Sequence, residues 1–340
     1  MPTTMADVAR VAGVSVKTVS NVINDYPYVR AETRARVVAA IDQLGYEVNL
    51  AARNLRLGRT GMIGLAVPEL RQAYFGELAD EVLRIGRERG VTVIIEPTGG
   101  TREQELQVLN GPGRKLTDGL LFIPVAVDVA DVAAVAPHVP LVLLGEQVAG
   151  AAAGVDHVSM RDSEAVEAAT RLLVERGRRR VAVVGMQREH PFATARLRYA
   201  GYLAALEACG IAFDPRLVGW APPTWRRADG AAGMAAVLDS GAEPDGVVAL
   251  NDSLAIGVLS ELRARGLSVP DDVAVIGFDD TDEARFTDPP LTTVDPGRGE
   301  IARVAFDLLW DRLQRSGAPH EPVTHLASMR IVERGTTPPH

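Results

Sequence analysis

The chain contains 340 residues, which is more than a single hydrophobic core usually holds, so we expect two or more domains. Its 47% hydrophobic and 24% charged residues are ordinary for globular proteins and exclude a disordered, collagen-like or coiled-coil chain. The formal net charge of −8 argues against a nucleic-acid partner for the chain as a whole.

The charge is distributed unevenly along the chain. Residues 1–60 carry eight Lys and Arg against five Asp and Glu, a net charge of +3. The other 280 residues carry 28 against 39, a net charge of −11. A small basic head joined to a large acidic body predicts two separate tasks.

No segment is expected to enter a membrane. The sequence has no run of about 18 apolar residues, and its N-terminus MPTTMADVAR lacks the basic start and apolar core of a signal peptide. The single cysteine, Cys209, cannot form an internal disulfide, and its helix-like surroundings predict a packing role. We therefore expect a cytoplasmic protein.

The head predicts three short helices. Apolar residues recur at helical spacing in residues 5–12 and 16–24, with Thr4 and Ser15 as the expected N-caps and Gly13 as a left-handed C-cap between them. A third helix is expected from Glu32 to Leu44, ended by Gly45. The second helix has one apolar face and one face of polar side chains, so a DNA-binding unit is favoured over a generic three-helix surface domain.

Two segments of the head, M-A-D-V-A-R-V-A-G-V-S-V-K-T-V-S-N-V-I-N and T-R-A-R-V-V-A-A-I-D-Q-L-G-Y, resemble the lactose and galactose repressor (LacI/GalR) family. The resemblance implies a helix-turn-helix domain over residues 1–48, whose second helix enters the major groove of DNA. It implies base contacts by Val16, Lys17 and Asn21. A Lys can donate to guanine, an Asn can pair with adenine, and a Val can touch a thymine methyl group. Thr4, Thr18, Ser20 and Asn24 are expected to contact phosphates.

Residues 49–60 form a basic segment, NLAARNLRLGRT, that is too short to be a stable helix alone. An ordinary linker is one interpretation. The family resemblance implies instead a hinge helix over residues 49–55 that folds when two subunits meet on DNA. Leu55 would then enter the minor groove as an apolar wedge, with Ala52 and Arg53 beside it. Arg53 and Arg56 would neutralise nearby phosphates.

Residues 61–340 predict an α/β core. Short apolar runs such as MIGLAVP, VTVIIEP, DGLLFIPV and RVAVVGM alternate with helical stretches. Because these runs lack an alternating polar pattern, they suit parallel strands that are covered on both faces. There are too many runs for one compact sheet, so we expect two successive lobes, with ligands bound between them at the carboxyl ends of the strands.

The core contains four further segments, A-R-L-R-Y-A-G-Y, A-L-N-D-S-L-A-I-G, V-A-V-I-G-F-D-D and P-P-L-T-T-V, that resemble the two-lobed periplasmic-binding-protein-like core of the same family. The resemblance implies that the chain crosses between the lobes. The first lobe would contain about residues 61–160 and 294–323, and the second lobe about residues 161–290 and 324–340.

The resemblance also implies the effector contacts. Arg198 matches an arginine that grips ligand hydroxyls or carboxylates, and Asn251 and Asp279 match an amide and a carboxylate that can engage a vicinal diol. Surface charge or turn formation is the alternative role for these three residues. Trp225, Tyr74 and Phe75 are expected as aromatic contacts, with core packing as the alternative. Arg161 departs from the family pattern, and its charge near the cleft favours an acidic effector such as a sugar phosphate or uronate.

No catalytic or metal-binding motif is found, and the six His residues are scattered along the sequence. Asp279 and Asp280 could be imagined as a glycosidase pair, but neighbouring side chains on a strand point to opposite faces. We expect neither a metal nor a cofactor.

The sequence therefore predicts a DNA-binding transcriptional regulator, with repression as the expected sign. It would bind a pseudo-palindromic operator as a homodimer and respond to a small-molecule effector, a sugar or sugar derivative, between the lobes. A dimer is favoured over a tetramer because the C-terminal segment has no leucine heptad. The alternatives are a cytoplasmic solute-binding sensor without DNA function and a sugar-processing enzyme.

Overall fold

The computed structural model describes residues 3–23, 26–46, 59–111, 116–136, 140–145, 148, 153–188, 192–315 and 321–337. The chain divides into two compact units, Met1–Thr60 and Gly61–His340. None of the helices in these described ranges is both long and apolar enough to cross a membrane.

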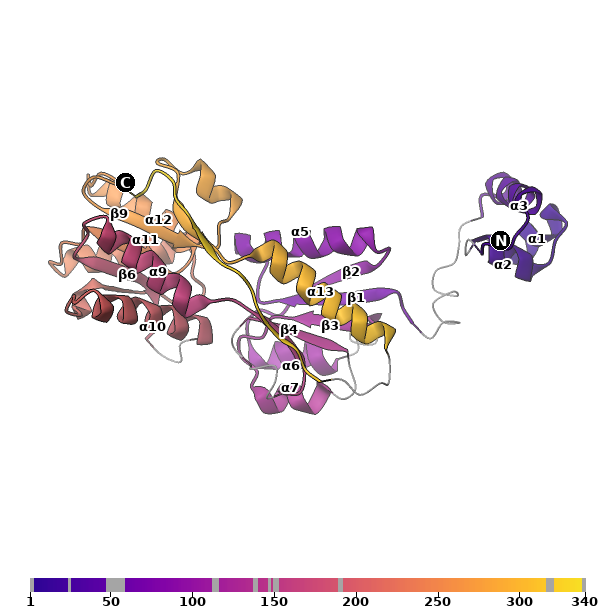
Figure 1. Cartoon of the computed structure of the whole chain (residues 1–340), viewed down its shortest axis with the longest axis horizontal. Helices are drawn as coiled ribbons and strands as arrows, with labels where there is room; N and C mark the ends of the chain where they lie inside the picture. The colour runs from indigo at the N-terminus through magenta and orange to yellow at the C-terminus, as the bar shows by residue number, and fades with distance from the viewer. Residues whose placement is uncertain are drawn as a thin grey trace. The chain divides into compact units, whose positions relative to one another are not determined.

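The first unit contains the helices α1 (Met5–Ala12), α2 (Val16–Ile23) and α3 (Ala31–Leu44) (Figure 1). Their apolar faces form one small core, which contains Val8, Ala9, Ala12, Val19, Val22, Val37, Ala40 and Tyr46. The predicted order of helices is confirmed. However, α3 begins one residue before the expected Glu32, and the expected last residue of the second helix, Asn24, lies outside the described residues.

Local capping explains where these helices begin and end. The side chain of Thr4 accepts a hydrogen bond from the Asp7 amide, while the Asp7 carboxylate accepts one from the Thr4 amide, which is a capping box. The Ser15 hydroxyl accepts from the Thr18 amide over 3.0 Å at the start of α2. Gly13, at φ 63°, ends α1 in the left-handed conformation that glycine adopts without steric cost.

The second unit contains two sheets, each with six strands among the described residues, and each sheet forms one lobe (Figure 1). The first sheet has the order β11-β5-β4-β3-β1-β2 and is parallel throughout. Its strands are β1 (Met62–Val67), β2 (Thr92–Pro97), β3 (Gly119–Phe122), β4 (Leu141–Leu144), β5 (Asp156–Ser159) and β11 (Thr324–Leu326).

The second sheet has the order β12-β10-β9-β8-β6-β7, in which only β12 runs antiparallel to its neighbour. Its strands are β6 (Val181–Met186), β7 (Val218–Trp220), β8 (Gly246–Ala249), β9 (Ala274–Phe278), β10 (Thr292–Asp295) and β12 (Arg330–Val332).

Helices cover both faces of each sheet. In the first lobe, α5 (Ala73–Glu88) and α13 (Arg298–Gln314) pack on one face, and α6 (Arg102–Asn110) and α7 (Val129–Val135) pack on the other (Figure 1). Alternate residues of one strand serve the two faces: Leu121 joins the α5 and α13 side, and Leu120 joins the α6 and α7 side.

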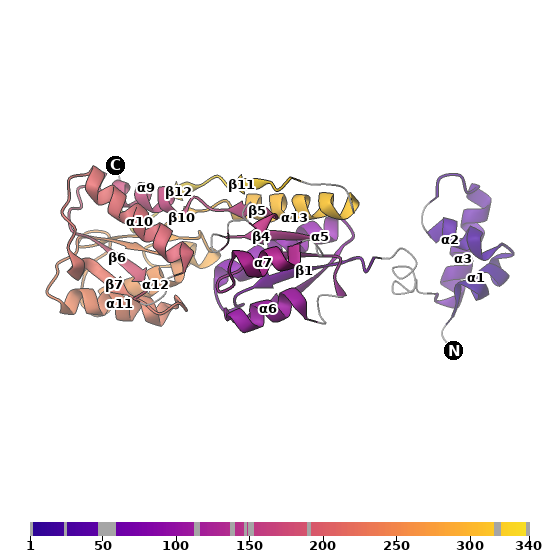
Figure 2. The ribbon, with the colours of Figure 1, turned by 90° about the horizontal axis from the view of Figure 1, so that it is seen from below.

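The second lobe is built in the same way. The helix pair α9 (Asp162–Glu175) and α10 (Ala193–Ala208) lies on one side of its sheet, and the pair α11 (Arg227–Asp239) and α12 (Asp252–Ala264) lies on the other (Figure 2). Short 3₁₀ helices occur at Pro215–Leu217 and Asp282–Phe286.

The described chain crosses between the lobes at three places: after β5, after β10, and between β11 and β12. Two of the approximate boundaries expected from the sequence shift by a few residues in the structure. Val294 and Asp295 belong to the second lobe because β10 pairs with β9 and β12, and residues 324–326 belong to the first lobe because β11 pairs with β5. Neither pairing is fixed by a local pattern of apolar residues. β10 pairs with β9, the strand directly before it, and β11 pairs with β5, which lies far earlier in the chain.

Candidate functional site

The helix α2 presents the predicted base-contact residues on its surface. Val16 is 45% exposed and Lys17 is exposed, while Asn21 is half-buried. Val19 and Val22 point into the core, so the polar face of α2 is directed away from the packing interface.

The predicted phosphate contacts have local partners as well. Thr4 donates to Asp7 over 2.6 Å, and the hydroxyl groups of Thr18 and Ser15 lie 2.8 Å apart. These side chains therefore hold the starts of α1 and α2 in place. The third predicted phosphate contact within the described residues, Ser20, is half-buried on α2. Asn24 and the hinge residues Ala52, Arg53 and Leu55 lie outside the described residues, so their roles stay predictions.

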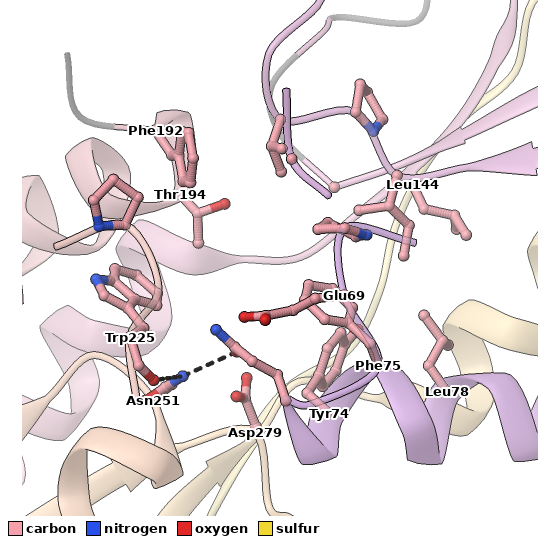
Figure 3. Close-up of a pocket in the computed structure, with 18 of the residues that line it drawn as sticks. Glu69, Tyr74, Phe75, Leu78, Leu144, Phe192, Thr194, Trp225, Asn251 and Asp279 are labelled. Carbon is pink, nitrogen blue, oxygen red and sulfur yellow. Dashed lines mark hydrogen bonds between the residues drawn. The ribbon is translucent and has the colours of Figure 1, made fainter. Parts of the chain in front are cut away.

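A cavity of about 460 Å³ lies between the lobes of the second unit (Figure 3). It lies at the carboxyl ends of β1, β3, β4, β8 and β9, as expected for two facing α/β lobes. Six of the seven predicted effector residues line it: Tyr74, Phe75, Arg198, Trp225, Asn251 and Asp279. Figure 3 shows labelled side chains of both lobes facing the same space.

Arg198 is almost fully buried at the side of this cavity. Its Nε donates to the Asp162 carboxylate over 2.6 Å, and its Nη1 donates to the Leu250 carbonyl. The guanidinium carbon lies 3.5 Å from the centre of the Phe278 ring. A buried arginine that is paired and stacked in this way is held in one orientation, with Nη2 3.9 Å from Asp279 Oδ1.

Asp279 combines burial with an unusual backbone conformation. Burial raises the pKa of Asp279 well above its usual range, and the nearby Arg198 cation opposes that shift. β9 ends at Phe278, and both Asp279 (φ 115°) and Asp280 (φ 46°) have positive φ. The two carboxyl groups were expected to point apart because they would lie on opposite faces of a strand, but neither residue belongs to β9. The carboxyl groups nevertheless point to different places, since Asp279 lines the cavity and Asp280 bonds to Arg334 over 2.5 Å.

Asn251 already has partners on several sides. Its Oδ1 caps α12 by accepting from the Leu254 amide over 2.8 Å. Its Nδ2 donates across the cavity to Gln72 Oε1 over 3.3 Å and to the Trp225 carbonyl over 3.4 Å. A ligand that accepts a hydrogen bond from this Nδ2 must therefore replace either the Gln72 or the Trp225 contact.

Sequence reasoning missed two residues that bridge the lobes at the cavity. Gln72 also donates to the Thr224 carbonyl over 2.8 Å, and Glu69 bonds to Arg226 over 3.1 Å. Their position just beyond β1, where the cavity opens, was the signal that could have identified them.

The aromatic residues serve both packing and the cavity. Tyr74 and Trp225 are less than 10% exposed and belong to the apolar cores of their lobes. The Trp225 Nε1 donates to the Gly185 carbonyl over 2.7 Å, which anchors the indole ring, and the backbone of Trp225 has a positive φ of 44°. Tyr74 meets Phe75 edge to face. The two alternatives considered for these residues are thus compatible.

Arg161 is the predicted effector residue that does not line the cavity. It precedes α9, is 40% exposed, and lies 3.4 Å from the Glu164 carboxylate on the next turn. Arg161 therefore gives no support to an acidic effector.

Within the described ranges, no group of three or more His, Cys, Asp or Glu residues could hold a metal ion.

Comparison with known proteins assigns both units. Residues 4–49 match the family described as bacterial regulatory proteins, lacI family, and residues 170–337 match a periplasmic binding protein-like domain. The chain is 30% identical over 335 residues to the HTH-type transcriptional repressor PurR of Vibrio atlanticus (strain LGP32), covering 98% of each protein.

Two solved structures extend this comparison over nearly the whole chain. The complex of the transcriptional regulator CelR with cellobiose is 29% identical, with a TM-score of 0.72, and the match covers 98% of this chain and 99% of that one. The lac repressor dimer bound to operator and the anti-inducer ONPF is 26% identical, with a TM-score of 0.84 and 99% of each chain covered.

Proposed function

The chain belongs to the lacI family of bacterial regulatory proteins, and from this premise we propose that it represses transcription as a homodimer on a pseudo-palindromic operator. An uncharged carbohydrate in the interlobe cavity would control that binding. Its relatives are transcriptional regulators, so we assign the chain no catalytic role, and we place it in the cytoplasm, where the chromosome of a bacterium lies.

The observation that carries the DNA-binding proposal is the exposed N-terminal end of α2. Val16 and Lys17 stand there on a helix whose other face is fixed in the core, which suits insertion into a major groove. The solved lac repressor complex is a dimer on its operator, and a dimer of this chain would place two such helices on two half-sites.

Selection of bound sequences from random double-stranded DNA tests this proposal with the full chain. We expect a symmetric consensus, and we expect Val16→Ala to change base preference at one position of each half-site. Val38 on α3 has the same 45% exposure as Val16, so Val38→Ala is the matched control and should leave the consensus unchanged. Failure of the wild type to enrich any sequence would favour the solute-binding sensor without DNA function.

The charges around the cavity favour an uncharged effector. Glu69 of the first lobe is paired with Arg226 of the second, and Arg198 is paired with Asp162, so each cation that lines the cavity already has a carboxylate partner. Aromatic side chains and the polar groups of Asn251 and Asp279 are suited to the apolar faces and hydroxyl groups of a sugar. The CelR structure holds cellobiose, a neutral sugar, in a chain of the same fold.

A thermal-melt screen tests the effector class. The panel contains uncharged mono- and disaccharides, including cellobiose, and the matching sugar phosphates and uronates. A ligand at about 100 times its Kd stabilises the folded state by roughly 2.7 kcal/mol, so a specific effector should raise Tm by several degrees. We expect hits among the uncharged sugars, and hits confined to sugar phosphates or uronates would contradict the proposal.

A further inference from the structure

The loop that carries Asp279 is held by both lobes. Asp279 and Asp280 each have positive φ, a conformation that is unfavourable for a residue with a side chain and persists only where the surroundings impose it. The contacts that impose it come from two directions.

The second lobe supplies one set of contacts. The Asp279 amide donates to the Val294 carbonyl over 2.8 Å, and the Thr281 amide donates to the buried Asp252 carboxylate over 2.8 Å. These bonds fix the loop against β10 and the start of α12, which are part of its own lobe.

The first lobe supplies the other set through Arg298 and Glu77. Arg298 Nη1 donates to the Asp279 carbonyl over 2.9 Å and lies 3.4 Å from the Asp280 carbonyl. Arg298 Nη2 lies 2.6 Å from one oxygen of Glu77, whose other oxygen accepts from the Asp282 amide over 2.9 Å. The two side chains thus bond to the loop at three of its residues and to each other.

Both residues belong to helices of the first lobe that pack side by side (Figure 1). Arg298 opens α13, directly after Gly297, whose φ of 78° turns the chain as it enters the first lobe. Glu77 lies on α5 one turn after Tyr74, an aromatic residue of the cavity wall. Movement of α5 relative to the second lobe would therefore pull on the loop at Asp279.

We propose that Arg298 and Glu77 are positioning residues through which the first lobe sets the conformation of Asp279, although neither lines the cavity. The proposal rests on the proposed function, in which Asp279 contacts the effector. It links effector recognition by the second lobe to the placement of the first.

An ordinary interlobe ion pair is the competing explanation. The side chains of Arg298 and Glu77 are 20% and 25% exposed, and a partly exposed pair adds little stability by charge alone. The distinguishing feature is the set of bonds to loop backbone, which a simple pair would not need.

Hydrogen–deuterium exchange of the full-length protein, without effector or DNA, tests the proposal. We expect Arg298→Met and Glu77→Gln each to speed exchange of the amides at residues 279–284 by about tenfold, and the double variant to add little more. Arg312→Met is the matched control, because Arg312 is also on α13 and bonds to Asp156 over 2.6 Å within the first lobe. It should leave these amides unchanged.

Two further variants separate positioning from charge pairing. Arg298→Lys keeps a cation opposite Glu77 but cannot donate to both carbonyl groups as a guanidinium does, so we expect intermediate exchange. The exchanged pair Glu77→Arg with Arg298→Glu restores opposite charges but removes the donors to the loop, so fast exchange should persist. Normal exchange at residues 279–284 in the exchanged pair, or in Arg298→Met, would overturn the proposal. Because the measurement uses neither sugar nor DNA, it can fail while the proposed function stands.

Discussion

At the residue scale, Asp279 lines the cavity with a carboxyl group whose protonation should affect the binding of a ligand there. Burial raises the pKa of this carboxyl well above its usual range, which favours the protonated form in the free protein. Ligand hydroxyl groups that donate to the carboxyl favour its ionised form, so effector binding should release a proton.

We therefore predict that the affinity for the sugar identified in the melt screen rises with pH until the carboxyl of the free protein is ionised. Asp279→Asn should weaken binding roughly tenfold or more, through loss of a hydrogen bond to a charged group, and should remove the pH dependence. Titration calorimetry in buffers of different ionisation enthalpy measures both the affinity and the released proton. Unchanged sugar affinity in Asp279→Asn would remove this residue from the effector site.

Asp252 gives a second pH effect, on stability. Burial raises its pKa from 3.8 to about 7, opposed by hydrogen bonds from Thr293 and Thr281, and the nearby Asp280 raises it further. Because the folded pKa lies above the unfolded pKa, the folded state binds more protons between these two values. The free energy of unfolding should therefore fall as pH rises from about 4 through about 7.

We predict that Asp252→Asn flattens this fall, since an amide can accept from Thr281 and donate to Thr293 without titrating. The difference should be on the order of a few kcal/mol at high pH, measured by urea unfolding over a pH series. Asp239→Asn, at an exposed position that pairs with Arg265, is the control. Identical pH profiles for wild type and Asp252→Asn would show that Asp252 stays ionised.

Residue identity predicted part of this site. Arg198 stands in a recognisable motif on α10, Asn251 and Asp279 stand in motifs just after β8 and β9, and all three line the cavity. Glu69 and Gln72 carry no motif, and their importance arises only when two lobes face each other. The motifs also do not show that Asn251 is the N-cap of α12. Nor do they show that Arg161 pairs with Glu164.

At the element scale, the first lobe shapes its side of the cavity through α6. The buried carboxylate of Glu105 accepts hydrogen bonds from the amides of Val125, Ala126 and Val127 over 2.8 to 3.0 Å. Burial raises the pKa of Glu105, and these three donors oppose that shift. Glu105 thus holds the loop that places Pro124 and Val125 in the cavity wall.

We predict that Glu105→Ala lowers the free energy of unfolding by about 2–4 kcal/mol, because three buried amides lose their acceptor. It should also weaken effector binding by loosening this wall. Glu103→Ala, at an exposed position of the same helix, should change stability by less than about 0.5 kcal/mol. Denaturant unfolding measures the free energy of unfolding of both variants. Equal losses of stability would refute the role of Glu105 in holding the loop.

The hinge segment yields a prediction that depends on sequence alone. If Leu55 enters the minor groove, Leu55→Ala should weaken operator binding by roughly tenfold or more while leaving sugar affinity unchanged. Binding to the selected operator, followed by fluorescence anisotropy, measures the first effect, and the melt screen measures the second. Full operator affinity in Leu55→Ala would exclude the wedge.

Helix ends were more predictable than strand partners. Thr4, Gly13 and Ser15 act on their own neighbours in sequence, so the start of α1, its end and the start of α2 follow from local patterns. The apolar runs correctly predicted buried parallel strands. The sequence pattern contains no signal for the partners of β10 and β11. β11 pairs with β5, more than a hundred residues earlier in the chain, whereas β10 pairs with the preceding strand β9.

At the scale of the whole molecule, the two lobes have similar α/β folds, and each is built from segments that are separated in the sequence. The family resemblance correctly predicted that the chain returns to the first lobe after the second, while the exact crossing points came from the structure. The three crossings bring both lobes to the cavity, so the site is assembled from segments that are distant in sequence.

The return of the chain to the first lobe also sets an order for folding during synthesis. The side chains Ile301, Phe306 and Leu309 of α13 complete the core on one face of the first sheet, and β11 completes one of its edges. A ribosome releases the chain from its N-terminus, so β1 to β5 emerge long before these partners exist. The lobe that is begun first therefore cannot be finished until the second lobe has been almost entirely synthesised, and one apolar face of its sheet stays uncovered in the interval.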